Sequence, residues 1–135
     1  MKLCSACLLG INCKYDGKSR ADERVIKLLK TEILIPVCPE QLGGLPTPRE
    51  PAELRAEKVI TSSGKDITNS CFDGANEVLK LVKLLGIKEA ILKQRSPSCG
   101  SGQVKMLSGE IVRCDGILAS LLKKNGITVI SEERV

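Results

Sequence analysis

The segment KLLGIKEAILKQRSPSCG, residues 83–100, contains the transition that decides the fold. A helical pattern ends at Gly86, the residue type that most often caps a helix in the left-handed conformation. The apolar run over residues 87–92 then has the length and composition of a buried strand. It stops at a turn that holds the Cys99 thiol between Pro97 and Gly100. Helix, glycine and strand occur again in LLKKNGITVI, residues 121–130, so we expect repeated β-α-β crossovers.

The rest of the chain follows the same alternation. Apolar runs predict strands over residues 1–6, 33–37 and 127–130, with a weaker one over 58–61, and helical periodicity predicts helices over 21–30, 66–85 and 115–124. No linker, repeat or low-complexity segment interrupts the 135 residues, and 42% apolar composition suits one core. The prediction is an α/β fold, a single domain over residues 1–135 arranged as a three-layer α/β/α sandwich with a mostly parallel, Rossmann-like sheet.

Composition narrows the classes of function. The chain has no histidine, which removes imidazole bases, Cys-His nucleophile pairs and zinc sites that need a histidine ligand. One tyrosine and one phenylalanine leave almost no surface for stacking nucleic-acid bases. The net charge of +5 is spread along helical faces, which is typical of a solvated surface but also suits an anionic small ligand or RNA. Neither a signal peptide nor an apolar run long enough to cross a membrane is present, so we expect a cytoplasmic protein.

Three of the seven cysteines stand where predicted strands end. Cys7 follows the first strand, Cys38 ends ILIPVC, and Cys99 lies in the turn after EAILK. In an open parallel sheet, the loops beyond the carboxyl ends of the strands meet at a common crevice where ligands bind. We therefore expect these three thiols to lie near one another although they are far apart in sequence. Cys71 and Cys114 are better interpreted as small buried hydrophobic residues.

Several roles are open to three convergent thiols. A structural zinc site commonly uses two C-x2-C pairs, and Cys4 with Cys7 is the only pair at that spacing. Thiolates are the usual ligands of iron-sulfur clusters, and three of them would leave one iron of a four-iron cluster without a protein ligand. A sulfur carrier or transferase that uses one low-pKa thiol, with Cys99 as the candidate, is an alternative. A closed, non-enzymatic zinc or cluster module is another.

Longer motifs resemble a known family. The strings SACLLG, CKYDG, CPEQLGGLPTPREPAE, GKDIT, AILKQRSPSCG and LLKKNGITVISEE resemble the DUF523 family, also called the thiouracil desulfidase family, in the same order and over nearly the whole chain. CPEQLGGLPTPR and SPSCG are the most specific of these strings. The resemblance implies a hydrolytic desulfidase that takes sulfur from a thiolated pyrimidine and releases sulfide without net redox change. A small-molecule thiopyrimidine is the expected substrate, and thiolated RNA is the less favoured one.

The resemblance also implies a cofactor. It places a [4Fe-4S] cluster on Cys7, Cys38 and Cys99, with Cys13 of CKYDG as the competing ligand, and leaves a free fourth iron to take the substrate's sulfur. The cluster is expected to be oxygen-sensitive, so protein prepared in air is expected to lose it or to hold zinc in its place.

Four further residues are candidates in the same motifs. Glu40 and Ser96 match the acid/base positions of the family, with a salt bridge to Arg49 as the alternative role of Glu40 and a turn hydrogen bond as that of Ser96. Ser98 is the alternate hydroxyl for binding the pyrimidine. Arg49 is a candidate for gripping a substrate carbonyl or phosphate, or for pairing with a neighbouring acid. Gly74 permits either close packing or the approach of a ligand, and the sequence leaves both open.

Overall fold

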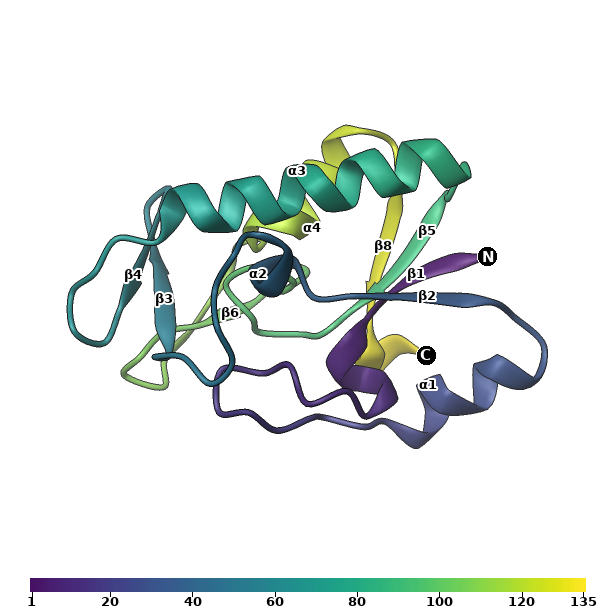
Figure 1. The fold of residues 1–135 in the computed structure, drawn as a ribbon, viewed down its shortest axis with the longest axis horizontal. Helices are drawn as coiled ribbons and strands as arrows, with labels where there is room; N and C mark the ends of the chain where they lie inside the picture. The colour runs from purple at the N-terminus through teal and green to yellow at the C-terminus, as the bar shows by residue number, and fades with distance from the viewer.

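A parallel four-stranded sheet forms the centre of the computed structural model, which describes residues 1–135 (Figure 1). Its strands are β1 (Lys2–Ser5), β2 (Leu34–Val37), β5 (Glu89–Leu92) and β8 (Thr128–Ser131), in the order β2-β1-β5-β8. β1 pairs in parallel with both β2 and β5, and β5 pairs in parallel with β8. The carboxyl ends of β1, β2 and β5 therefore lie at one edge of the sheet, as the crossover pattern predicts.

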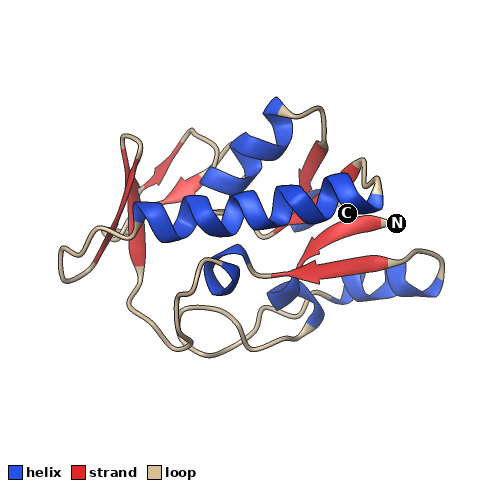
Figure 2. Cartoon of the chain, turned by 45° about the horizontal axis from the view of Figure 1, so that its top comes forward, coloured by secondary structure: helices blue, strands red, loops and turns tan.

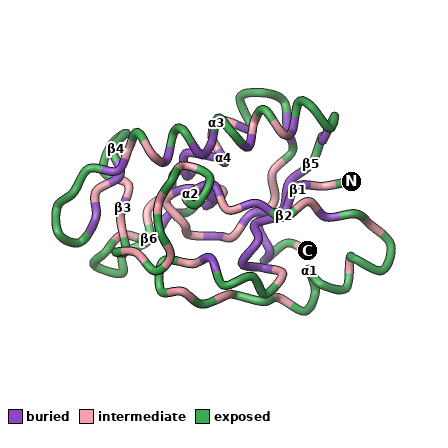
Figure 3. The backbone as a smooth tube through the Cα atoms, in the orientation of Figure 1, coloured by how far each residue is buried: buried purple, intermediate pink, exposed green.

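Helices cover both faces of this sheet, which confirms the predicted three layers. α3 (Thr68–Leu85) and α4 (Ile117–Lys124) pack together on one face, whereas the 3-10 turn η1 (Ala6–Leu9) and α1 (Glu23–Lys27) lie on the other (Figure 1). Successive residues of a strand point to opposite faces, so Leu3 joins the core under α3 and α4 while Cys4 joins the smaller core under η1 and α1. Buried residues accordingly concentrate on the central strands and on the inner side of α3 (Figure 3).

The longest helix, α3, shows why the spacing of apolar residues in the sequence was enough to predict it. Its buried residues recur at spacings of three and four, the period of one helix face, and they are Cys71, Gly74, Ala75, Val78 and Val82. Gly86 ends the helix with φ +68°, a left-handed conformation that side-chain-bearing residues rarely adopt. No helix of the chain is long and apolar enough to form a membrane span.

Most of the short elements outside the central sheet were not predicted. The weak strand expected over residues 58–61 exists as β4 (Lys58–Thr61), but it pairs antiparallel with β3 (Ala52–Arg55) in a hairpin of its own. A second hairpin joins β6 (Val104–Lys105) to β7 (Ile111–Val112). Figure 2 shows both hairpins at the end of α3 that lies away from the start of β5. The 3-10 turns η2 (Leu28–Lys30) and η3 (Glu132–Arg134) complete the fold.

One unpredicted helix, α2 (Pro39–Leu42), packs directly on α3. The contact depends on two glycines. A Cβ atom on Gly74 would lie 1.7 Å from the carbonyl oxygen of Pro39, and one on Gly43 would lie 1.9 Å from that of Ser70. Both distances are far inside van der Waals contact, so no other residue fits without displacing backbone. Gly74 therefore serves close helix packing, which fixes the position of the loop that starts at Cys38.

Candidate active site

A cavity of about 460 Å³ opens at the carboxyl edge of the sheet. Four of the seven cysteines line it, and they are Cys7, Cys13, Cys38 and Cys99. Glu40, Arg49 and Ser96 line it as well. The structure thus brings the three thiols predicted from strand topology to one place, together with their competitor Cys13 and three of the four other candidates.

Each of the three predicted thiols comes from the end of a different strand. Cys7 lies in η1 directly after β1, Cys38 is the residue that precedes the first turn of α2 after β2, and Cys99 lies in the turn after β5. Because β1 is hydrogen-bonded to both of its neighbours, these three strand ends are adjacent in space. The sheet therefore brings the three thiols to one cavity from the ends of three different strands.

Cys13 adds a fourth thiol from the loop after η1. A hydrogen bond with the Cys38 thiol lowers the pKa of Cys13, whereas a hydrogen bond with the Cys7 thiol and burial raise it. The net effect is a pKa above the ordinary value of a thiol. The Sγ atom of Cys38 lies 3.7 Å from the carbonyl oxygen of Cys13. Cys4 and Cys71, by contrast, are buried in the two cores and do not line the cavity. The C-x2-C pair of Cys4 and Cys7 therefore does not form part of a zinc site, because only Cys7 lines the cavity.

Cys13, Cys38 and Cys99 favour the protonated form while no metal is bound, because the pKa of each thiol is raised. Burial raises the pKa of Cys99 to about 12. A hydrogen bond with Cys13 raises the pKa of Cys38 well above its ordinary value, and burial raises it further. A sulfur carrier needs an exposed thiol of low pKa, so the structure does not support Cys99 as such a nucleophile. Metal ligation would deprotonate these thiols and offset the cost of burying their charge.

The donor set fits an iron-sulfur cluster better than a single ion. No group of three or more cysteine or carboxylate side chains converges on one ion position. A [4Fe-4S] cluster does not need such convergence, because each thiolate binds a different iron at a different corner of the cluster. Thiols carried by three different strand ends around one cavity match that requirement, and soft sulfur donors without histidine suit iron and sulfur chemistry.

Glu40 stands on α2, two residues after Cys38. Its Oε1 atom accepts a hydrogen bond from Nε of Arg49 at 3.3 Å, and its Oε2 atom has no hydrogen-bond partner within the protein. The carboxylate lies near enough to raise the pKa of both Cys38 and Cys99. The salt bridge considered as an alternative is therefore present, but it leaves one carboxylate oxygen available at the cavity.

Arg49 is almost entirely buried and its hydrogen bonds are committed to the protein. Besides Glu40, the guanidinium donates to the carbonyl oxygen of Cys13 at 2.9 Å, to that of Pro46 at 3.2 Å and to Oγ1 of Thr47 at 3.0 Å. A guanidinium has five N–H groups that can donate hydrogen bonds. The Arg49 guanidinium donates four hydrogen bonds, all of them to acceptors within the chain. This arrangement favours a role in holding Glu40 and the Cys13 loop over the predicted role in gripping substrate.

The two serines of SPSCG have different surroundings. The Oγ atom of Ser96 accepts the backbone N–H groups of Ser98 and Cys99, each at 3.1 Å, so the predicted turn hydrogen bond is present while the hydroxyl hydrogen stays free at the cavity. Ser98 does not line the cavity. Its hydroxyl is buried beside Cys71 without a hydrogen-bond partner, because the turn packs Ser98 against the start of α4. The structure thus gives no support to Ser98 as a substrate-binding residue.

Sequence reasoning missed several polar residues of the cavity wall. Ser5, which ends β1, and Gln94, which lies after β5, both line the cavity. Ser5 stands two residues before Cys7 in SACLLG, so its place at a strand end was the available signal. A serine on a short strand is too common for that signal to be specific.

A parallel α/β sheet with an acid, a hydroxyl and four thiols around one cavity at its carboxyl edge defines a cysteine-lined candidate active site on a Rossmann-like fold. The sequence model of the 2-thiouracil desulfurase family matches residues 3–134. The chain belongs to this family of enzymes, which confirms the resemblance seen in its motifs.

Two relatives extend the comparison. The uncharacterized protein YbbK of Bacillus subtilis (strain 168) is 40% identical over 147 residues, covering 100% of this chain and 97% of the relative. The solved structure of the [4Fe-4S]-dependent thiouracil desulfidase TudS superposes with a TM-score of 0.94 at 40% identity, covering 99% of this chain and 91% of that chain. Agreement over almost the full length of each protein extends the similarity to the elements that build the cavity.

Proposed function

We propose that this chain is a [4Fe-4S]-dependent desulfidase that hydrolyses a thiolated pyrimidine, so that thiopyrimidine and water give the oxygen-containing pyrimidine and hydrogen sulfide. Membership of the 2-thiouracil desulfurase family and the similarity to TudS support the reaction class. The observation that carries the proposal is the presence of Cys7, Cys38, Cys99 and Glu40 on the wall of one cavity. Three ligands and a free carboxylate are the parts that such a reaction requires.

Cys7, Cys38 and Cys99 are the proposed ligands because each comes from a separate strand end. When bound by three cysteines, a [4Fe-4S] cluster supplies an open iron, a soft Lewis acid suited to a thiocarbonyl sulfur. Cys13 is the competing fourth thiol. Its thiol lies beside the thiols of Cys7 and Cys38.

Glu40 is the proposed base. Its Oε2 atom is free to accept a proton from water, while Arg49 holds Oε1 and so fixes the plane of the carboxylate. The water oxygen then bonds to the carbon that carries sulfur, the carbon–sulfur bond breaks, and the proton passes to the departing sulfur. No electrons enter or leave, so the reaction needs no external reductant.

Ser96 is proposed to orient the pyrimidine or relay the proton. Its oxygen accepts two backbone N–H groups, which fixes the hydroxyl at the cavity and leaves its hydrogen to donate. A volume of about 460 Å³ lies within the range of small-molecule sites, which spans roughly 300–1,000 Å³. This size favours a free thiopyrimidine base or nucleoside over thiolated RNA.

The test uses the full chain reconstituted with iron and sulfide without oxygen. Incubation with 4-thiouracil should release sulfide and uracil in equal amounts, and in ¹⁸O-labelled water the new carbonyl oxygen should carry the label. Protein loaded with zinc serves as the control for metal without cluster. Absence of sulfide from 4-thiouracil and from 2-thiouracil would overturn the proposed activity, and unlabelled uracil would overturn hydrolysis.

A further inference from the structure

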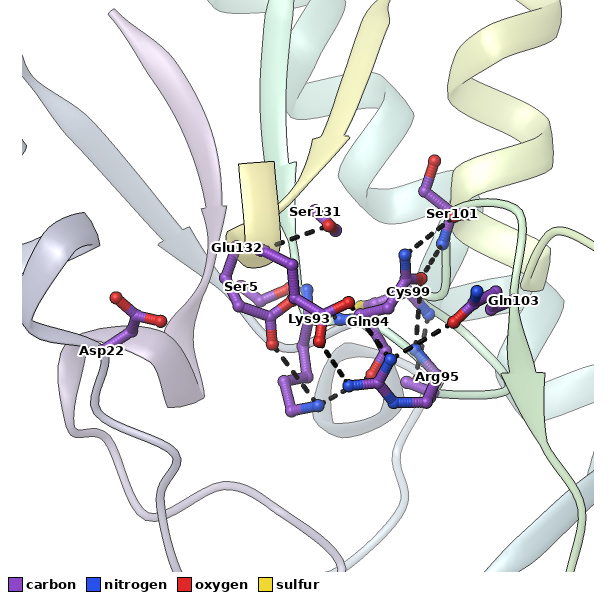
Figure 4. A network of polar contacts seen from close by, with 12 residues as sticks. Ser5, Asp22, Lys93, Gln94, Arg95, Cys99, Ser101, Gln103, Ser131 and Glu132 are labelled. Atoms are coloured by element: carbon purple, nitrogen blue, oxygen red, sulfur yellow. Dashed lines mark hydrogen bonds and ion pairs between the residues drawn. The ribbon is translucent and has the colours of Figure 1, made fainter. Parts of the chain in front are cut away.

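The side chain of Gln94 closes the loop that carries Cys99. Gln94 is the second residue after β5, and its side chain is buried. Its Oε1 atom accepts the backbone N–H of Ser101 at 2.8 Å, and its Nε2 atom donates to the carbonyl oxygen of Ser101 at 3.0 Å. We call this pair of bonds the Gln94 clasp (Figure 4). It joins the two ends of the segment 94–101, which contains Ser96 and Cys99.

The backbone from which the clasp projects is itself fixed to the sheet. Oε1 of Glu132 accepts the backbone N–H of Gln94 at 2.7 Å, and the Glu132 side chain is buried (Figure 4). Oε2 of the same carboxylate lies 3.5 Å from Nζ of Lys93. Glu132 begins η3 directly after β8, the strand that pairs with β5. The Gln94 clasp therefore holds the Cys99 loop relative to the central sheet.

The start of α4 supports the same loop from another side. The N–H groups of residues 116–118 donate to carbonyl oxygens on both sides of Cys99, namely those of Pro97, Ser98 and Gly100, at 2.8–3.0 Å. None of these bonds uses the Cys99 sulfur. They fix the position of the Cys99 backbone, which decides where the sulfur lies.

Open space next to the clasp makes its two bonds important. Gln94 lines the cavity and also a second pocket of about 300 Å³, and Ser101 lines only the second pocket. The Gln94 side chain thus stands between the two. A segment beside open space is held less by packing than one in the core, so its position depends more on hydrogen bonds. Without the clasp, the second pocket leaves room for Ser101 to move.

We propose that Gln94 is a positioning residue that preforms the Cys99 corner of the cluster site. The inference rests on the cofactor of the proposed function. A ligand loop that is ordered before binding loses less conformational entropy when the metal group arrives, which raises the affinity. Partners that orient a ligand usually matter for metal affinity although they do not touch the metal. Gln94 acts through the loop backbone, so its effect exists in the cluster-free chain as well.

The first test compares Gln94→Met with Gln103→Met in the cluster-free chain. Methionine is similar in length to glutamine but cannot reproduce the paired bonds of the amide. Gln103 is the matched control, because it is exposed and its Oε1 atom accepts from Arg95, not from Ser101. Iodoacetamide should alkylate Cys99 roughly 5- to 150-fold faster in Gln94→Met, the range for loss of two ordinary hydrogen bonds. Gln103→Met should match the wild type.

Cys4 serves as the internal reference for this measurement. It is buried in the core under η1 and α1 and does not line the cavity. A general loss of stability would accelerate the alkylation of Cys4 and Cys99 together, so the ratio of the two rates isolates the loop. Peptide mass spectrometry gives both rates from the same sample.

The second test uses the chain reconstituted with iron and sulfide without oxygen. Gln94→Met should weaken iron retention against a chelator by roughly 10- to 100-fold, the usual cost of losing a group that orients a metal ligand. Gln103→Met should retain iron like the wild type. Gln94→Asn keeps the amide but is one methylene shorter. It serves if Gln94→Met does not fold, and it should shift both measurements in the same direction.

Three results would overturn the inference and leave the desulfidase proposal intact. They are an unchanged Cys99 rate in Gln94→Met, an equal acceleration of Cys4 and Cys99, and faster Cys99 alkylation without a change in iron retention. A loaded wild-type chain that shows both Gln94 effects but releases no sulfide would overturn the activity alone. A wild-type chain that takes up no cluster would overturn the cofactor and, with it, the role of Gln94 in the cluster site.

Discussion

Nε of Arg49 donates a hydrogen bond to Oε1 of Glu40 across 3.3 Å, and both side chains are largely buried at the cavity wall. The same guanidinium donates to the carbonyl oxygen of Cys13, so one side chain connects the proposed base, Glu40, to the loop that carries the fourth thiol. Glu40 keeps a second oxygen without a partner. The pair therefore combines a fixed carboxylate with an available proton acceptor, which is the geometry a base requires.

Arg49→Lys should destabilise the chain because an ammonium cannot reproduce the planar fork that reaches four acceptors. We expect the free energy of unfolding to fall by about 1.5–3 kcal/mol, the usual worth of hydrogen bonds to a charged group. Urea unfolding of the cluster-free protein measures it. In a double-mutant cycle with Glu40→Gln, the coupling should be about 0.5–3 kcal/mol. Strictly additive effects would show that the two side chains do not support each other.

Glu40→Gln should lower turnover of 4-thiouracil by roughly 10²- to 10⁴-fold, the range for lost general acid/base catalysis. Glutamine keeps the size of the side chain but cannot take a proton, so substrate affinity should change much less. Glu50→Gln is the matched control, since Glu50 also lines the cavity but its carboxylate is bonded to Ser62 and Ser63. Near-wild-type sulfide release by a fully reconstituted Glu40→Gln protein would remove Glu40 from the mechanism.

Cys38→Ser should abolish the visible absorption of the anaerobically reconstituted cluster, and Cys7→Ser and Cys99→Ser should do the same. Cys71→Ser should leave it, because Cys71 is buried in the core and does not line the cavity. Cys13→Ser is the discriminating variant. It should retain the absorption and the iron content if three cysteines hold the cluster, and loss of both would make Cys13 a ligand.

Ser98→Ala should leave turnover unchanged, because the Ser98 hydroxyl lies outside the cavity. Removing a buried hydroxyl that has no hydrogen-bond partner should also leave the free energy of unfolding unchanged or raise it. Ser96→Ala provides the contrast, since it loses a hydroxyl at the cavity and two bonds to the Cys99 turn. A rise in KM on Ser98→Ala without loss of stability would reinstate Ser98 as a binding residue.

Gly74→Ala should destabilise the chain by about 1–3 kcal/mol or more through overpacking against Pro39. The direction of the change is informative, because replacing glycine by alanine in an unobstructed helix interior would raise the free energy of unfolding by up to about 1 kcal/mol. The exposed neighbour Asp73 provides the control, and Asp73→Ala should change the free energy of unfolding by no more than about 0.5 kcal/mol. Thermal or urea unfolding measures both, and stabilisation by Gly74→Ala would contradict the packing seen between α2 and α3.

The central sheet was predictable because its signals are local. The apolar run of β5 and the three-and-four spacing on α3 are written in consecutive residues, and Gly86 marks the boundary between them. Of the hairpin of β3 and β4 only β4 was predicted, because β3 has the sequence AELR and therefore lacks a continuous apolar run. α2 was missed because four residues are too few to show a helical period.

The sequence by itself determined the parallel order of elements, the three strand ends that carry Cys7, Cys38 and Cys99, and the family to which their motifs belong. Only the tertiary structure decided which neighbouring side chains serve the cavity. Ser96 and Ser98 are two residues apart, yet one faces the cavity and the other the core. Arg49 meets Glu40 and Cys13 through a fold of the loop, and the Ser5 hydroxyl meets the backbone N–H of Lys93 across two strands. Side-chain direction and contacts between distant residues arise from packing, and a local pattern does not encode them.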